Sequence, residues 1–62
     1  MNFVKISDRR LNLDTVESID EERDEDGNVV ILRISTINSP NQYVYEDDEA
    51  KENFKILEKF FQ

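Results

Sequence analysis

The chain has 62 residues, no cysteine and no histidine, and it carries 15 acidic against 8 basic side chains, for a formal net charge of −7 at pH 7. This length allows one domain, near the lower limit for burying a hydrophobic core, and the lack of cysteine excludes disulfides and thiolate metal sites. Without histidine the commonest general base and zinc ligand are missing, so we expect a non-enzymatic protein that holds no cofactor.

The first segment predicts a β-hairpin. In "FVKISDRRLNL" a two-residue turn at Asp8-Arg9 would place Ile6 opposite Leu11 and collect the aliphatic side chains on one face. Asp-Arg is not a favoured turn pair, so a longer loop that starts at Ser7 is the alternative.

The middle of the chain predicts a second hairpin. "VESIDEER" has a weak hydrophobic pattern, whereas "VVILRISTI" is β-branched and apolar on both faces, as in a central strand. Asp26-Gly27 between them suits a two-residue turn, because both turn positions need positive φ. That turn would pair Ile19 with Ile34, and a three-residue loop or a bulge remains the alternative.

The same turn also begins like a calcium-binding loop. Glu22, Asp24 and Asp26 occupy positions 1, 3 and 5 of that pattern, and Gly27 occupies position 6. Position 12, which must supply a bidentate carboxylate, is Arg33 instead, and a strand rather than a helix follows. We therefore favour a hairpin tip without metal, with a weak calcium site as the minor alternative.

The spacing of apolar residues changes near the end of the chain. "QYVYE" alternates as a last strand, and from there Ala50, Phe54, Leu57 and Phe61 recur at i, i+4, i+7 and i+11, which is typical of an amphipathic helix. Such a helix must bury its apolar stripe, and one face of a sheet is the available partner.

These elements predict one α+β domain over residues 1–62, with a small antiparallel sheet of about five strands and one C-terminal helix packed on one face. The strands are expected at roughly 3–6, 10–13, 16–24, 29–37 and 42–46, and the helix at roughly 48–61.

One face of the strongest strand has no predicted cover. If Val30, Leu32 and Ile34 face the helix, Val29 and Ile31 point the other way and are candidates for a dimer or partner surface. Together with the acidic hairpin and two adjacent arginines they define the predicted partner surface, which comprises Val29, Ile31, Glu21, Glu22, Asp24, Asp26, Arg9 and Arg10.

The stretch "FVKISDRRLNLDTVESIDE" resembles small bacterial proteins that open with a strand, a polar turn, "LNLD" and a second strand. More distantly it is similar to the short flagellar accessory protein family typified by FlbD, where an "LN" step and an "IE" strand precede a glycine-containing hairpin and a final acidic helix. The chain departs from that pattern at residues 38–41, where it has a loop with a proline. The resemblance implies the same strand order and an accessory role, and it brings no catalytic residue.

The predicted function is that of a small acidic module that binds another protein or a second copy of itself. No apolar run is long enough for a signal peptide or a membrane span, so a cytoplasmic location is expected. The negative charge opposes direct binding to nucleic acid or to a membrane, but it allows an alternative function. In that alternative the chain imitates a nucleic-acid backbone and inhibits a nucleic-acid-binding protein.

Overall fold

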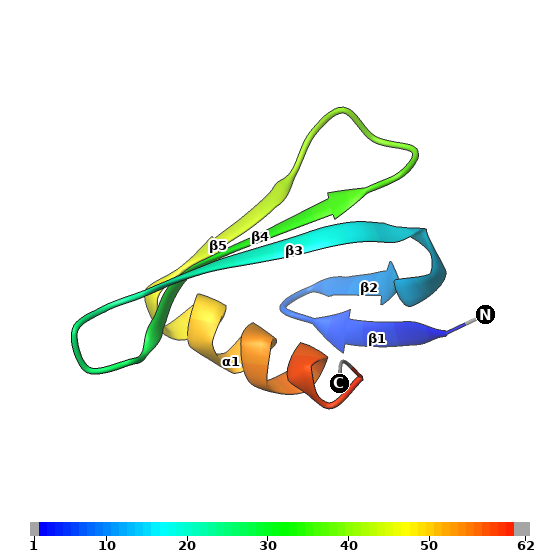
Figure 1. Cartoon of the computed structure of the whole chain (residues 1–62). Coiled ribbons are helices and arrows are strands. Elements are labelled where there is room, and N and C mark those ends of the chain that lie inside the picture. Colours follow the sequence, from blue (N-terminus) through cyan, green and yellow to red (C-terminus); the bar gives the residue numbers. More distant parts are fainter. Residues whose placement is uncertain (1, 61–62) are drawn as a thin grey trace.

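The computed structural model describes residues 2–60 and has the predicted α+β architecture with antiparallel strands (Figure 1). In chain order the elements are β1 (Phe3–Ile6), β2 (Arg9–Asn12), a 3₁₀ turn η1 (Leu13–Thr15), β3 (Val16–Arg23), β4 (Val29–Thr36), β5 (Tyr43–Glu46) and α1 (Asp47–Glu58). The predicted helix extended further, to residue 61, and Phe61 lies outside the described residues.

The five strands form two sheets and not one. β1 pairs with β2, and β3, β4 and β5 form a separate sheet in that order. The turn η1 separates the two sheets: the side chain of Asn12 accepts a hydrogen bond from the Asp14 N–H (3.0 Å), and the Thr15 hydroxyl donates to the Asn12 carbonyl (2.8 Å). These local bonds redirect the chain before β3 begins, so β2 does not continue into the larger sheet.

The register of the first hairpin differs from the prediction. Ile6 lies opposite Arg9, so the turn consists of Ser7 and Asp8, and the expected turn at Asp8-Arg9 is wrong. Ser7 has a φ of 52° and its hydroxyl contacts α1, donating to the Glu49 carboxylate (2.5 Å) and accepting from the Asn53 side-chain amide (2.9 Å). The position of this turn therefore goes with a contact to a helix more than forty residues further along the chain. The turn preferences of residues 7–10 carry no information about such a contact.

The second hairpin closes with a three-residue loop, Glu25–Gly27. Asp24 and Asn28 flank it: the Gly27 N–H donates to the Asp24 carbonyl (3.1 Å), and the Asp24 N–H donates to the Asn28 carbonyl (3.0 Å). Gly27 has a φ of +84°, as the last residue of such a loop requires. The expected two-residue turn is therefore wrong, and the three-residue alternative is confirmed.

The strands of this hairpin pair Ile19 with Ile34, as predicted, but the register shifts near the turn. Glu22 pairs with Ile31 while the next residue, Arg23, pairs with Val29, so Val30 is an extra residue on β4. Because of this bulge the side chain of Val29 points into the core, where it is 5% exposed. The prediction that Val29 lies on a free surface is therefore wrong. Ile31 is half-buried and lies on the face away from the helix.

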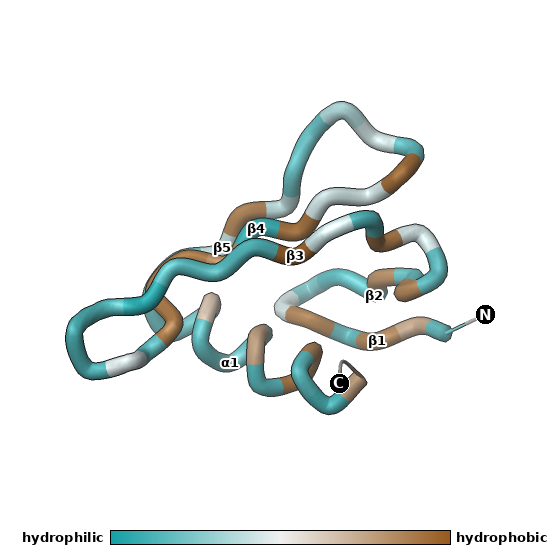
Figure 2. Tube along the Cα trace, viewed as in Figure 1, coloured by the Kyte–Doolittle hydropathy of each residue, from teal (hydrophilic) through white to brown (hydrophobic). Residues whose placement is uncertain are grey.

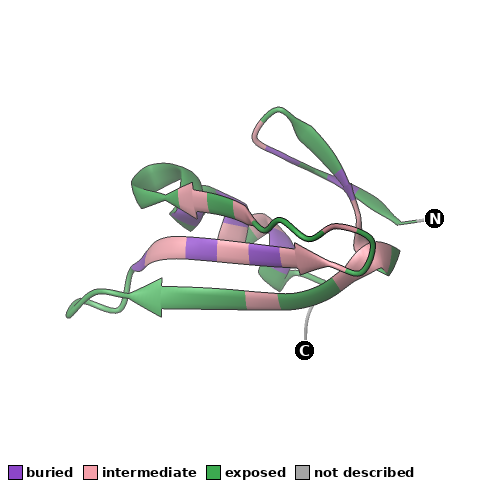
Figure 3. Ribbon diagram, turned by 90° about the horizontal axis from the view of Figure 1, so that it is seen from above, coloured by how far each residue is buried: buried purple, intermediate pink, exposed green. Residues whose placement is uncertain are grey.

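The core lies between the three-stranded sheet, α1 and the β1–β2 hairpin, which are on the same side of that sheet (Figures 1 and 2). Its buried apolar side chains are Val4, Ile6, Leu11, Val29, Leu32, Ile34, Ala50 and Leu57. The central strand β4 supplies three of them, whereas β3 is exposed over most of its length (Figure 3).

Candidate protein-docking groove

An open groove of about 510 Å³ lies between β3, η1 and α1. The helix packs mainly on β4, β5 and β1, so the edge strand β3 has little cover on the side that faces α1. The groove is lined by half-buried apolar side chains and by polar residues, namely Leu13, Val16, Ile19 and Phe54, with Glu17, Ser18, Glu21 and Glu58.

The sequence of β3 explains why the groove stays open. Ile19, Glu21 and Arg23 are opposite Ile34, Leu32 and Val29, three core residues of β4, so these β3 side chains point to the helix side of the sheet. Only Ile19 is apolar. Because charged side chains are strongly disfavoured in a dry core, Glu21 and Arg23 stay at the boundary and the helix does not close over β3.

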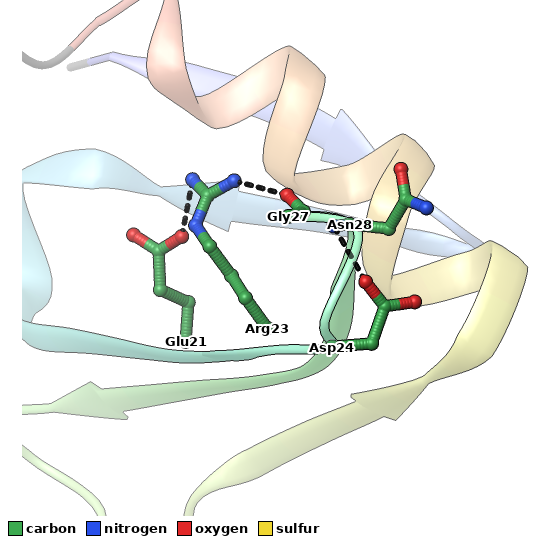
Figure 4. A network of polar contacts seen from close by, with 5 residues as sticks. All are labelled: Glu21, Arg23, Asp24, Gly27 and Asn28. Carbon is green, nitrogen blue, oxygen red and sulfur yellow. Dashed lines mark hydrogen bonds and ion pairs between the residues drawn. The ribbon is translucent and has the colours of Figure 1, made fainter.

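The charged side chains order one end of the groove (Figure 4). Arg23 forms an ion pair with Glu21 (2.6 Å) and donates a hydrogen bond to the Gly27 carbonyl (2.7 Å). Its guanidinium carbon lies 5.3 Å from the centre of the Phe54 ring, within the range of a cation–π contact. Arg23 thus links the hairpin tip to α1 and pairs with one of the three carboxylates around the apolar floor, that of Glu21; the other two belong to Glu17 and Glu58.

The acidic turn is a structural feature with its own hydrogen bonds. One Asp24 carboxylate oxygen accepts the N–H groups of Asn28 (2.9 Å) and Asp26 (3.0 Å). The hydrogen bond from the Asn28 backbone is the main cause that lowers the pKa of Asp24 below its ordinary value of 3.8. Asp24 therefore holds the loop in shape as a carboxylate.

The calcium alternative finds no geometric support in this hairpin. Glu22 and Arg33, at positions 1 and 12 of the motif, form an ion pair across β3 and β4. Asp24 already accepts two backbone hydrogen bonds. Within residues 2–60 no three Asp or Glu side chains are grouped so that they could hold a metal ion.

The predicted partner residues do not form one surface. Of the eight, only Glu21 lines the groove; Glu22 and Ile31 lie on the opposite face of the sheet, and Val29 is in the core. Asp24 and Asp26 are at the tip of the second hairpin, and Arg9 and Arg10 belong to β2. The Arg9 guanidinium stacks over Tyr43 of β5, 4.1 Å from the ring centre. This contact joins the first hairpin to the three-stranded sheet.

Most groove residues were not predicted as site residues. These are Leu13, Val16, Glu17, Ser18, Ile19, Phe54 and Glu58. The available signal was the mixture of apolar and acidic side chains in "VESIDEER", which is too polar for a covered strand and too apolar for a fully solvated one.

The outer face of the three-stranded sheet is polar. Across it Asp20 pairs with Arg33, which in turn pairs with Val44, and in the next row Ile31 lies between Glu22 and Glu46. Val44 is 53% exposed. These isolated aliphatic side chains among charges do not make a continuous apolar patch, so the groove is the better candidate for a binding surface.

Comparison with known protein families, curated protein sequences and solved structures finds no match for this chain. The resemblance to the FlbD-type family therefore stays a prediction. Fold and site together define a small acidic α+β protein with an apolar, acid-rimmed groove beside an edge strand. In the part of the chain that the structure describes, no helix has the length and apolar character needed to cross a membrane.

Proposed function

We propose that this chain is a non-enzymatic binding module that docks a segment of another protein in the groove between β3 and α1. The observation that carries the proposal is a floor of four half-buried apolar side chains, open to solvent and surrounded by three carboxylates. An apolar depression with a polar rim is the usual arrangement of a protein-binding surface. The non-enzymatic assignment rests on the composition, because histidine and cysteine are absent from the sequence.

The charge of the rim indicates the chemistry of the partner. The rim holds Glu17, Glu21 and Glu58 against Arg23, so it keeps a net negative charge and favours a segment whose apolar side chains are flanked by lysine or arginine. The net charge of −7 steers a cationic protein towards the chain and opposes approach of a second, equally charged copy. We therefore favour a cationic partner over the homodimer, and the expected compartment is still the cytoplasm.

The nucleic-acid-mimic alternative receives less support. Two neighbouring acids of β3, Glu21 and Glu22, are already ion-paired with Arg23 and Arg33 of the same chain. This neutralisation lowers the density of free negative charge along the strand that a polyanion mimic needs.

The test is affinity capture from the source organism, using the whole chain and two variants of equal charge. Glu17→Gln with Glu21→Gln removes two rim carboxylates, and Asp20→Asn with Glu22→Gln removes two carboxylates of the same strand from its other face. We expect the wild type and the second variant to retain the same partner in a salt-sensitive manner, and the rim variant to lose it. Equal retention by both variants would contradict a groove-centred function.

A second measurement addresses self-association. Size-exclusion chromatography with light scattering is expected to show a monomer at low and at moderate salt, because copies that each carry a net charge of −7 repel one another. A stable dimer whose formation is blocked by Val16→Lys would instead identify a second copy as the occupant of the groove.

A further inference from the structure

We infer that the segment which occupies the groove is an amphipathic helix of about three turns, lying beside α1 and beneath β3, and not a strand added to the edge of β3. This inference rests on the proposed function and specifies the conformation and pattern of the partner segment.

The free edge of β3 disfavours pairing with an additional strand. The pairing of β3 with β4 shifts register between Val16 and Ser18, where Glu17 is an extra residue on β3 itself, and again between Glu22 and Arg23, where the extra residue is on β4. Bulges and inward-pointing charges are the devices by which edge strands avoid further pairing. Glu21 and Arg23 supply inward-pointing charges, so a strand added here would place its side chains against an ion pair.

The space beside α1 has the width of a helix. Neighbouring strands are about 4.8 Å apart, so the two strands β4 and β5 span roughly the 10 Å diameter of the helix that packs on them. Packed helices lie about 8–10 Å apart, which would place a second helix under β3 and along its open edge. Phe54 and Glu58, one turn apart on α1, would form the wall that this second helix contacts.

The length of the groove also matches a helical stripe. From Val16 to Glu21 the strand rises by about 17 Å, at roughly 3.3 Å per residue. Apolar residues at i, i+4, i+7 and i+11 of a helix span about 16.5 Å. Lysine or arginine on both sides of that stripe would reach Glu17 and Glu21 on the strand side and Glu58 on the α1 side.

The experiment uses the whole, isotope-labelled chain and two peptides of identical composition, each of about 16 residues. In the helical peptide, leucines are spaced i, i+4, i+7 and i+11 with lysines beside them; in the alternating peptide, the same leucines and lysines follow a period of two. We expect the helical peptide to bind about tenfold more tightly, to gain helical circular dichroism on binding, and to shift the resonances of Val16, Ile19 and Phe54.

Two matched pairs of variants locate the binding. Glu21→Gln and Glu22→Gln each remove one carboxylate that is ion-paired with an arginine, but only Glu21 faces the groove. Val16→Thr alters the groove floor, while Val44→Thr makes the same change on the outer face. We expect the groove variants to weaken binding by about three- to tenfold and the outer-face variants to leave it unchanged.

The outcomes separate this inference from the proposed function. If the alternating peptide binds as tightly as the helical one and shifts β3 amides, the occupant is extended: the inference is overturned and the function stands. If Glu22→Gln weakens binding as much as Glu21→Gln, the attraction is non-specific and the inference also fails. If neither peptide nor the captured partner shifts groove resonances, both the inference and the proposed function are overturned.

Discussion

Separate truncation of Val29 and Val30 to alanine tests the bulge that moves one of these valines into the core. Val29 is 5% exposed and Val30 is half-buried. Each substitution removes two methyl groups, which at about 0.8 kcal/mol per buried carbon gives roughly 1.6 kcal/mol for Val29, and about 2 kcal/mol with a cavity contribution. For Val30 about half of this loss is expected, roughly 1 kcal/mol. The lost β-propensity is similar in both variants, so it does not affect the comparison.

These losses are large for a chain of this size. At about 0.05–0.15 kcal/mol per residue the whole domain has a free energy of unfolding of roughly 3–9 kcal/mol. Since 1 kcal/mol shifts the Tm of a small domain by about 4–8 °C, Val29→Ala should lower the Tm by about 8–16 °C and Val30→Ala by about 4–8 °C. Thermal and urea unfolding followed by far-ultraviolet circular dichroism measure both changes.

The control for this comparison is Val44→Ala, on the outer face, where the side chain is 53% exposed and a smaller change is expected. Uninterrupted alternation along β4 makes the opposite prediction, with Val30 inside and Val29 outside. A loss for Val30→Ala that equals or exceeds the loss for Val29→Ala would therefore refute the bulged register.

Three further predictions concern the turns and the contact between the first hairpin and α1. Because the pKa of folded Asp24 is lowered from 3.8, its carboxylate contributes stability above that pH and loses it as the pH falls through the folded value. The stability advantage of wild type over Asp24→Asn, measured by urea unfolding, should therefore shrink as the pH falls below about 4; a constant difference would contradict this role. Gly27→Ala should destabilise by about 1 kcal/mol through its φ of +84° alone, since an added Cβ meets no atom within 4 Å, and Gly27→Asn should cost less. A double-mutant cycle of Ser7→Ala and Asn53→Ala should give a coupling of about 0.5–1.5 kcal/mol for their 2.9 Å hydrogen bond, whereas additive losses would show that this bond contributes nothing.

The strength of the local pattern decided which elements could be predicted. The helix Asp47–Glu58 follows from apolar spacing, because Ala50 and Leu57 fall on one face and are both fully buried. The strand β4 follows from its run of β-branched residues. The pairing of Ile19 with Ile34 was predicted from a two-residue turn, and it holds because the bulge at Val30 offsets the longer three-residue loop. For the helix and for β4 itself, a few adjacent residues contain the physical cause; for the register they do not.

The candidate site could not be predicted in the same way, because its residues meet only in space. Phe54 and Glu58 come from α1 and Val16 and Glu17 from β3, and nothing local to either segment shows that they face one another. The hydrophobic pattern of β3 was recognised as weak, but nothing in it showed that α1 would leave one face of this strand uncovered.

By itself, the sequence determined the α+β class, the presence of two hairpins and a terminal amphipathic helix, and the strongly acidic character. These properties depend on side-chain periodicity and composition, which act within a few residues. Only the tertiary structure decided that Ser7 turns the first hairpin against Asn53, that a bulge buries Val29, and that α1 leaves β3 uncovered. The physical reason is that a one-residue change of register reverses every side chain of a strand, and the choice between registers depends on packing against segments distant in the chain.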